Sequence, residues 1–308
     1  MCPGLLLIAL LPPFGRGIAS EGPPLVGAAE SHNPSPAAGG LASGPECRRK
    51  ASPMNTEQVV ARIRQKDWTL LEQPGAIGPE AASAIQALLQ DQNVEVRELA
   101  VNALAQAGGP VARKGLIMAV KDRSDMVRAA ACRHLQLNYA AEDLPELTAE
   151  LGSNPDEFVR EQVGLVLGRI GSTNAIAPLA RQFQKESDLH ARQAISLALA
   201  RLGEDANRQA YLQRLRQSDP KERALAVRDL LYVNDRKLVP QVLPLLDDLR
   251  PALNVGPSHG PYLIRVCDVT INVLDEFLKH PFSFKIEPAR RYSEKEIATA
   301  KTVLAQIK

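Results

Sequence analysis

One arrangement of apolar and polar positions repeats five times between residues 93 and 234. Each copy carries an arginine, an apolar residue three positions later and a leucine seven positions later, and successive arginines are 31 or 32 residues apart. Positions +3 and +7 lie on one helix face, so each copy predicts an amphipathic helix with one buried stripe. The arginines are Arg97, Arg128, Arg160, Arg192 and Arg223, and the leucines are Leu104, Leu135, Leu167, Leu199 and Leu230.

The same copies share start and stop signals. Four residues before each arginine is a residue type that caps helix N-termini, and three copies have a glycine where the helix should end. Pro220 follows one of these caps, at a position where its missing N–H is harmless. The caps are Asn93, Ser124, Asp156, Asp188 and Asp219, and the glycines are Gly108, Gly171 and Gly203.

A shorter amphipathic segment precedes each of these helices, so each copy predicts a helical hairpin. A hairpin of this size cannot bury both of its apolar stripes, and successive hairpins must therefore stack side by side. The segment KLVPQVLPLLDDL, residues 237–249, adds the first helix of another hairpin. We expect an all-α fold, a right-handed α-solenoid of about six helical hairpins.

The composition excludes several classes of protein. Aromatic residues make up only 4% of the 308 residues, which argues against a β-sandwich, a barrel or a Rossmann core. The 37 basic and 35 acidic side chains are interspersed and leave a net charge of +2, so no strong field attracts nucleic acid or a membrane surface. The cysteines Cys2, Cys47, Cys132 and Cys267 lie too far apart for a zinc motif or a disulfide framework.

The first 53 residues differ from the rest, because Gly, Pro, Ala and Ser recur in stretches that bury little apolar surface. We expect residues 1–53 to be a disordered leader. Two alternatives stay open: Leu5 to Leu11 could serve as the core of a signal peptide, and Met54 could be the natural start. We expect a cytoplasmic protein, or an exported, periplasmic one if residues 1–20 are a signal peptide.

The array becomes irregular near its end. Residues 250–262 are rich in Gly and Pro and predict a loop. In the next helix, we place Leu274 in the leucine column, which puts Cys267 in the arginine column. The alternative register puts Arg265 in the arginine column and Asn272 in the leucine column.

The domain boundaries follow from this pattern. We assign residues 54–280 to the repeat solenoid and residues 281–308 to a C-terminal extension. Its last helix is predicted to begin after Ser293, with Glu296 completing a capping box. We expect that helix to cover the exposed end of the stack, because terminal repeats need a polar outer face.

The hairpins of about 31 residues, the proline inside the first helix (Pro145 and Pro178) and the aspartate-then-arginine start of the second helix resemble HEAT repeats. They are similar to the short bacterial kind, HEAT_2 or phycobilisome-lyase-like, over residues 78 to about 280. The resemblance implies a ladder of Asp and Arg side chains that ties successive repeats together. In this chain the ladder role falls on Asp156, Asp188, Asp219, Arg97, Arg128, Arg160, Arg192 and Arg223, whereas Asn93 and Ser124 depart from the aspartate column.

The sequence carries little sign of catalytic chemistry. No GxGxxG, GxxxxGK[ST], HExxH or GxSxG motif occurs. HEAT-repeat hydroxylases carry paired His-Glu motifs for a di-iron site, and this chain lacks such motifs. We therefore expect no metal site, no cofactor and no enzymatic activity.

One cluster of residue types could support chemistry. His259, Arg265, Cys267 and Asp268 are near one another in the chain, and a cysteine beside a histidine is a candidate nucleophile. The alternative is that Cys267 faces the core while Asp268 caps the helix or pairs with Arg265. We expect a structural or partner-binding role for Arg265 and Asp268.

The remaining candidate site is the inner face. Positions +1, +5 and +9 from each column arginine lie away from the buried stripe and should line the concave side. From the second repeat onward they are mostly apolar with one arginine per repeat, which suits an acidic or amphipathic peptide. The alternative is an ordinary solvated face with leucines packed between neighbouring helices. These candidate partner-binding arginines are Arg133, Arg169, Arg201 and Arg228.

The sequence thus favours a monomeric, non-enzymatic scaffold that binds a protein or peptide on its concave face. Two alternatives stay open: a bilin-lyase-like protein that handles a chromophore, as the resemblance implies, and a structural module of a periplasmic assembly.

Overall fold

The computed structural model describes residues 54–73, 75–255 and 262–306, so the expectations for residues 1–53 and for His259 lie outside the described residues. Within these ranges the chain forms fourteen α-helices, several short 3-10 turns and one antiparallel pair of strands. The helices are α1 (Thr56–Arg64), α2 (Ala82–Ala87), α3 (Val94–Ala107), α4 (Gly109–Ala119), α5 (Asp125–Leu135), α6 (Leu144–Ser153), α7 (Glu157–Ile170), α8 (Ile176–Lys185), α9 (Leu189–Arg201), α10 (Asp205–Arg214), α11 (Pro220–Val233), α12 (Val239–Val242), α13 (Val266–Phe277) and α14 (Glu294–Ala305). The strands are β1 (Pro251–Asn254) and β2 (Leu263–Arg265).

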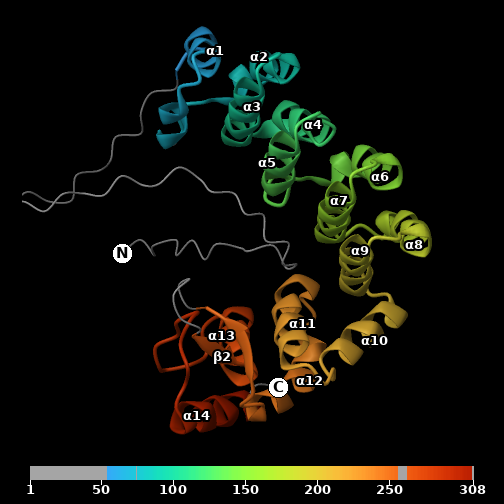
Figure 1. Cartoon of the computed structure of the whole chain (residues 1–308), viewed down its shortest axis with the longest axis vertical. Coiled ribbons are helices and arrows are strands. Elements are labelled where there is room, and N and C mark those ends of the chain that lie inside the picture. Colours follow the sequence, from blue (N-terminus) through green and yellow to red (C-terminus); the bar gives the residue numbers. More distant parts are fainter. Residues whose placement is uncertain (1–53, 74, 256–261, 307–308) are drawn as a thin grey trace, which may run out of the picture.

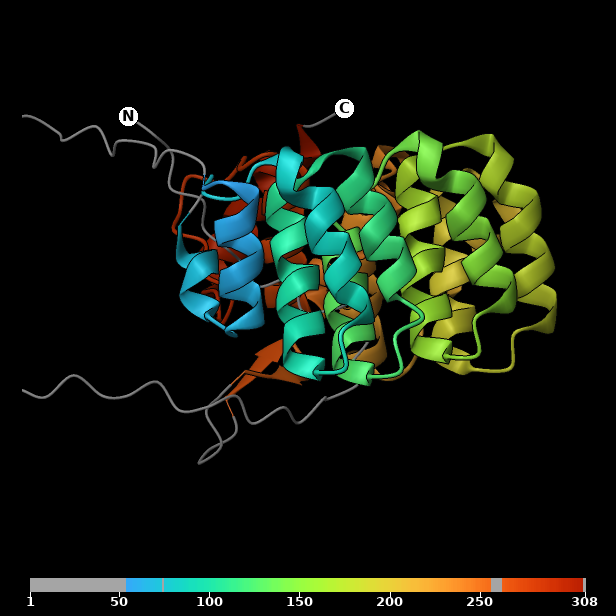
Figure 2. The ribbon, with the colours of Figure 1, turned by 90° about the horizontal axis from the view of Figure 1, so that it is seen from above.

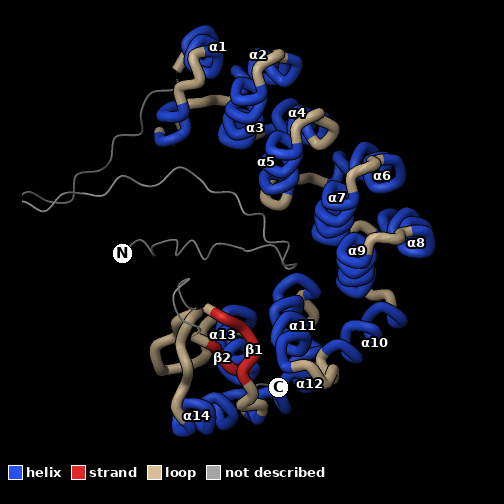
Figure 3. Tube along the Cα trace, viewed as in Figure 1, coloured by secondary structure: helices blue, strands red, loops and turns tan. Residues whose placement is uncertain are grey.

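The helices form an open arc of stacked hairpins (Figure 1). Helices α3, α5, α7, α9 and α11 line the inner side, and α2, α4, α6 and α8 form the outer layer (Figures 1 and 3). Seen from above, successive hairpins lie side by side along the arc (Figure 2). The described pairs from α2–α3 to α12–α13 are six hairpins, which confirms the predicted helical solenoid.

The start signals place the inner helices as predicted. Ser124 is the N-cap of α5, although its own backbone N–H donates to the Asp122 carboxylate (2.8 Å) instead of its side chain capping the helix. Helix α1 is capped by Asn55, one residue before the first helical residue, Thr56. In the inner helices α3, α7, α9 and α11, the cap side chain accepts hydrogen bonds from backbone N–H groups of the first turn at 2.9 to 3.0 Å. These caps are Asn93, Asp156, Asp188 and Asp219.

The leucine column is the centre of the core. All five column leucines are buried, and they belong to one continuous apolar cluster that extends through the stack. In α13, Leu274 and Cys267 are fully buried whereas Asn272 is not, so the expected register of that helix is confirmed. Burial of this column therefore sets how each hairpin faces the next.

The sixth hairpin departs from the prediction of a regular first helix. Helix α12 has only four residues and continues as the 3-10 turn Leu243–Asp247, because Pro240 and Pro244 each remove a backbone donor. The predicted loop at residues 250–262 is also wrong at its start, where residues 251–254 form a strand. It begins with β1, which pairs with β2 and packs against α11.

The C-terminal extension ends as predicted. Ser293 caps α14, its hydroxyl accepting from the Glu296 backbone N–H (3.3 Å) while the Glu296 carboxylate accepts from the Ser293 backbone N–H (2.8 Å). Helix α14 packs against α13 and the Leu243–Asp247 turn. It therefore lies at the end of the stack, where a capping helix is needed.

Helices α7 and α9 approach each other closely because α7 carries glycine on the contact face. A Cβ at Gly168 would overlap the Tyr232 hydroxyl and lie 2.9 Å from the Cα of Ala198. Tyr232 comes from α11, and its hydroxyl donates to the Leu165 carbonyl of α7 at 2.7 Å. Glycine at position 168 thus allows three inner helices to meet.

A pair of glycine substitutions tests this close approach. Gly168→Ala should lower the free energy of unfolding by about 1 to 3 kcal/mol, because the added methyl overpacks the contact with Ala198 and Tyr232. Gly152→Ala is the matched control, since a Cβ there meets nothing within 4 Å on helix α6. That control should stabilise the protein by about 0.5 to 1 kcal/mol. Urea unfolding of both variants measures the difference, and equal effects would contradict the packing described above.

Candidate functional site

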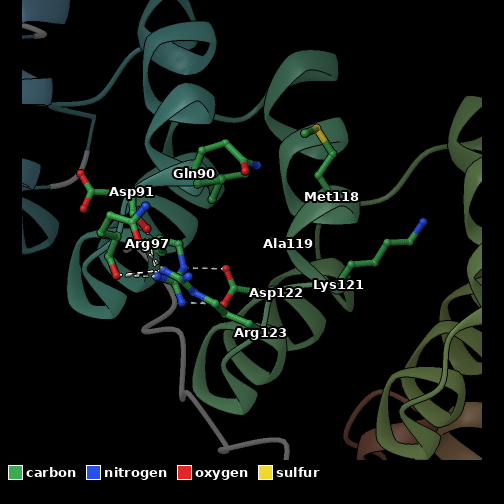
Figure 4. Close-up of a pocket in the computed structure, with 10 residues that line it drawn as sticks. Gln90, Asp91, Arg97, Met118, Ala119, Lys121, Asp122 and Arg123 are labelled. Carbon is green, nitrogen blue, oxygen red and sulfur yellow. Dashed lines mark hydrogen bonds and ion pairs between the residues drawn. The ribbon is translucent and has the colours of Figure 1, made fainter.

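The ladder arginines lie at the rim of the solenoid, where each inner helix begins. Arg97 of α3 is buried and donates from Nε and Nη2 to the two carboxylate oxygens of Asp122, at 2.8 and 2.9 Å (Figure 4). Its Nη1 donates to the backbone carbonyls of Asp91 and Gln92. Because Asp122 belongs to the loop before the next inner helix, this bidentate pair joins two successive repeats.

The other ladder pairs also join successive repeats, but their acceptors differ from the implied aspartate column. Asp156 accepts from Arg128 at 2.6 Å, as the resemblance implied. Arg160 pairs instead with Glu186 at 2.7 Å, two residues before Asp188. Asp188 and Asp219 serve as N-caps of α9 and α11.

The last two ladder arginines have unlike surroundings. Arg223 pairs with Asp248 at 2.8 Å. Arg192 is exposed, and its guanidinium lies 4.9 Å from the centre of the Phe183 ring. The residue that precedes the next cap by two positions is Gln217, which has no charge to offer Arg192. The ladder prediction is therefore confirmed for four arginines, while Arg192 differs. Of the three predicted aspartates, Asp156 accepts from a ladder arginine, whereas Glu186 and Asp248, from outside the predicted column, accept from two others.

Two of the four candidate partner-binding arginines make contacts inside the protein. Arg169 and Arg201 are half-buried, and their guanidinium groups lie over the Tyr232 ring, 5.3 and 5.5 Å from its centre. Arg201 also donates to the backbone carbonyls of Gly168 and Tyr232, and Arg169 donates to Gln136. Burial lowers the pKa of Arg169 from its ordinary value. These two side chains hold neighbouring repeats together.

The apolar inner-face positions on the same helices are buried as well. Leu165 of α7 and Leu197 of α9 are buried in the core, which differs from the expectation of an exposed apolar ridge. The cause is the close packing of α7, α9 and α11 around Tyr232. In this half of the arc the leucines pack between neighbouring helices, as the alternative interpretation of the sequence had it.

The inner face is open at α5. Helix α4 lies behind α5 while α3 and α7 flank it, so its exposed stripe faces the concave side. Arg133 is exposed on this stripe, and Leu137, one turn later, is 73% exposed. Arg133 forms no ion pair with any residue in the part of the chain that the structure describes. An unpaired cation beside a large exposed leucine is a surface suited to a partner.

A short turn next to α3 adds an aromatic residue at the same end of the inner helices. The 3-10 turn Trp68–Glu72 contacts α3, and the side-chain amide of Gln106 donates to the Leu71 carbonyl at 2.7 Å. Trp68 is 41% exposed on this turn. Gln106 near the end of α3 and Leu137 just after the end of α5 occupy the same repeat position, so the turn and Leu137 belong to neighbouring repeats.

Sequence reasoning missed a polar pair on this face. The Nε2 of His134 lies 2.8 Å from the Asn102 side-chain oxygen, which links α5 to α3. Burial, helped by the positive charge of Arg133, lowers the pKa of His134 to about 4. The imidazole is therefore neutral at pH 7, and Arg133 is the positive charge beside it on α5. The shared repeat position of Asn102 and Arg133 pointed to this face, but not to the pair.

The C-terminal cluster is internal. Asp268 is fully buried at the start of α13, and its carboxylate accepts from the Arg265 side chain at 2.8 and 2.9 Å and from the Tyr292 backbone N–H at 3.0 Å. Arg265 also donates to the Tyr292 carbonyl at 2.6 Å. Burial raises the pKa of the Cys267 thiol to about 11, which disfavours the nucleophilic thiolate. Arg265 and Asp268 thus fasten the C-terminal extension to α13.

The described ranges contain no group of three or more His, Cys, Asp or Glu side chains placed to hold a metal ion. No helix among the residues in those ranges is both long and apolar enough to cross a membrane.

Comparison with known proteins identifies the repeats. The HEAT-repeat family model matches residues 68–136 and 114–200, which together span residues 68–200. No curated protein sequence matches the chain. Among solved structures, the chain is similar to the complex of CpcE and CpcF of phycocyanin lyase from Nostoc sp.. The two share 18% identity with a TM-score of 0.47, and the match covers 86% of this chain and 100% of that chain. Human deoxyhypusine hydroxylase in complex with glycerol matches with 16% identity, a TM-score of 0.36, and coverage of 74% of this chain and 96% of that chain.

The ladder predicts that two arginines in the same sequence column contribute unequally to stability. Arg160→Gln should lower the free energy of unfolding by about 3 kcal/mol, because it leaves the buried Glu186 carboxylate without its cation. Arg192→Gln should cost less than about 1 kcal/mol, because Arg192 is exposed. Chemical denaturation measures both, and equal costs would show that the column is a solvated row.

The Arg160–Glu186 pair predicts that the free energy of unfolding decreases at acid pH. Arg160 lowers the pKa of Glu186 to about 2, from an ordinary value of 4.5. A carboxyl whose pKa is lower in the folded state stabilises the protein above the unfolded pKa, and this contribution is lost as pH falls from about 4.5 toward 2. This acid-dependent loss of free energy of unfolding should be smaller in Arg160→Gln and unchanged in Arg192→Gln.

Proposed function

Residues 68–200 are HEAT repeats, and from this premise we propose that the chain is a non-catalytic scaffold that holds a protein partner on its concave face. The partner segment that fits this face is acidic or amphipathic. Several observations support the proposal: a curved stack of hairpins, an inner side lined by successive helices, and exposed cationic and apolar side chains on that side.

The observation that carries the proposal is the arrangement of Arg133 and Leu137. Arg133 lies in the last turn of α5, and Leu137 lies four residues later in the turn that follows the helix; both are exposed, so a partner helix can meet them with residues one turn apart. A carboxylate of the partner pairs with the Arg133 guanidinium, and a large apolar side chain covers Leu137. An exposed apolar side chain next to an available cation favours an amphipathic segment over a purely acidic one.

Arg228 on α11 gives the face a second cation. It is only half-buried and forms no ion pair with a residue in the described ranges. Arg169 and Arg201 lie between Arg133 and Arg228 along the array, but both are held against Tyr232. We therefore assign partner contact to Arg133 and Arg228 and a structural role to the two arginines between them.

A peptide-selection experiment tests the proposal. A displayed library of 20-residue peptides is panned on the immobilised full chain, and the selected peptides are titrated by calorimetry. Arg133→Glu should weaken binding about tenfold or more, roughly 1.4 kcal/mol, by repelling the acidic residue. Leu137→Ser should weaken it by a similar factor through lost apolar contact. Binding should also weaken with salt, because screening shortens the reach of the charges.

The matched control is Arg181→Glu. Arg181 is an exposed arginine on the outer helix α8, so its reversal changes the net charge equally on the convex side. It should leave the affinity within about twofold of the unmodified protein, a difference of less than about 0.5 kcal/mol. The proposal fails if the library yields no peptide, or if Arg181→Glu weakens binding as much as Arg133→Glu.

A further inference from the structure

The α10–α11 hairpin holds polar groups that the rest of the repeat stack does not satisfy. Five buried polar atoms in it have no hydrogen-bond partner among the described residues: Nε of Arg208, the hydroxyl of Tyr211, Oδ1 of Asp229, and Nε and Nη2 of Arg223, whose guanidinium still makes its ion pair with Asp248. Tyr211 and Asp229 are almost completely inaccessible to solvent. Unsatisfied buried polar groups weaken the packing of the element that carries them. This hairpin is therefore a weak point between the regular repeats and the irregular sixth hairpin.

Asp229 is the most constrained of these groups. It lies on α11 with 1% of its surface exposed, and its Oδ2 accepts from Nη1 of Arg214 on α10 at 2.5 Å. Arg214 is shared, because the side-chain oxygen of Gln193 on α9, in the amide orientation that satisfies both groups, accepts from the same guanidinium at 2.9 and 2.5 Å. One guanidinium thus serves two acceptors, and the second oxygen of Asp229 has no hydrogen-bond donor among the residues that the structure describes.

The charges around Asp229 do not offset its burial. Arg214 on α10 and Arg228 on α11 favour the ionised carboxylate, whereas Glu222 on α11 opposes it, and the nearby Tyr211 of α10 is a neutral phenol. Helix α9 contributes the neutral amide of Gln193. Burial outweighs the two cations and raises the pKa of Asp229 to about 6, from an ordinary value of 3.8.

We propose that the α10–α11 hairpin is an acid-tightened joint, in which protonation of Asp229 removes a buried charge and strengthens the packing of α10 against α11. The sign follows from linkage. When a carboxyl binds its proton more tightly in the folded than in the opened state, the folded state becomes more stable as pH falls through the folded pKa of that carboxyl. The joint is thus looser at pH 7.5 than at pH 5, opposite to the behaviour of ion-paired carboxylates such as Glu186.

Hydrogen exchange on the full chain tests the proposal. Protection factors of α10 and α11 amides, corrected for intrinsic exchange, should rise about tenfold between about pH 7.5 and pH 5.0, given a folded pKa near 6 and an opened-state pKa near 4. Amides of α4 and α5 supply the internal reference. A flat profile, or protection that falls with pH in α10 and α11, would overturn the proposal.

Three variants make the assignment specific. Asp229→Asn is uncharged at every pH and should give high protection in α10 and α11 that no longer depends on pH. Arg214→Gln removes the cation that favours ionisation and should move the midpoint to higher pH. Asp143→Asn replaces another buried aspartate, which Arg113 contacts at 2.7 Å, and should leave the profile of α10 and α11 unchanged. If Asp229→Asn keeps the rise, another group titrates and the joint does not depend on Asp229.

Discussion

The constraint on which this structure depends is that no single hairpin can bury its own apolar surface. The column leucines of the inner helices are buried in one apolar cluster that runs through the stack, so a repeat is folded only because the next one covers it. The rim ladder has a different task. Its ion pairs join an inner helix to the loop before the next one, and they fix the lateral position of hairpins that apolar contact alone would allow to slide.

The same stacking produces two unlike halves of the inner face. Around α7, α9 and α11, the absence of a side chain at Gly168 lets the helices approach, and Tyr232 fills the space with two arginines against its ring. Around α5, the His134–Asn102 pair and the contacts of Gln136 with α7 leave the side chains of Arg133 and Leu137 exposed to solvent. Close packing in one half and availability in the other thus follow from a few side chains on an otherwise regular array.

The sequence predicted most of the fold because the fold is local and repeated. Caps, column leucines and hairpin spacing act within about 30 residues, and five copies confirm one another. It failed where the outcome depends on distant partners. Arg169 and Arg201 could not be distinguished from Arg133, because their engagement depends on Tyr232 up to two repeats later. Likewise, Glu186 and Asp188 both precede α9, and only the three-dimensional path of the loop decides which of them meets Arg160.

The hydrogen bond from Tyr232 to the Leu165 carbonyl spans 67 residues and skips an entire hairpin. Arrays of this kind lengthen and shorten in evolution by copying or deleting single units, because each unit normally contacts only its neighbours. Here the α8–α9 unit cannot be lost or duplicated without separating Tyr232 from its acceptor. The segment from α7 to α11 therefore behaves as one inherited block, and changes in repeat number should be tolerated on the N-terminal side of it.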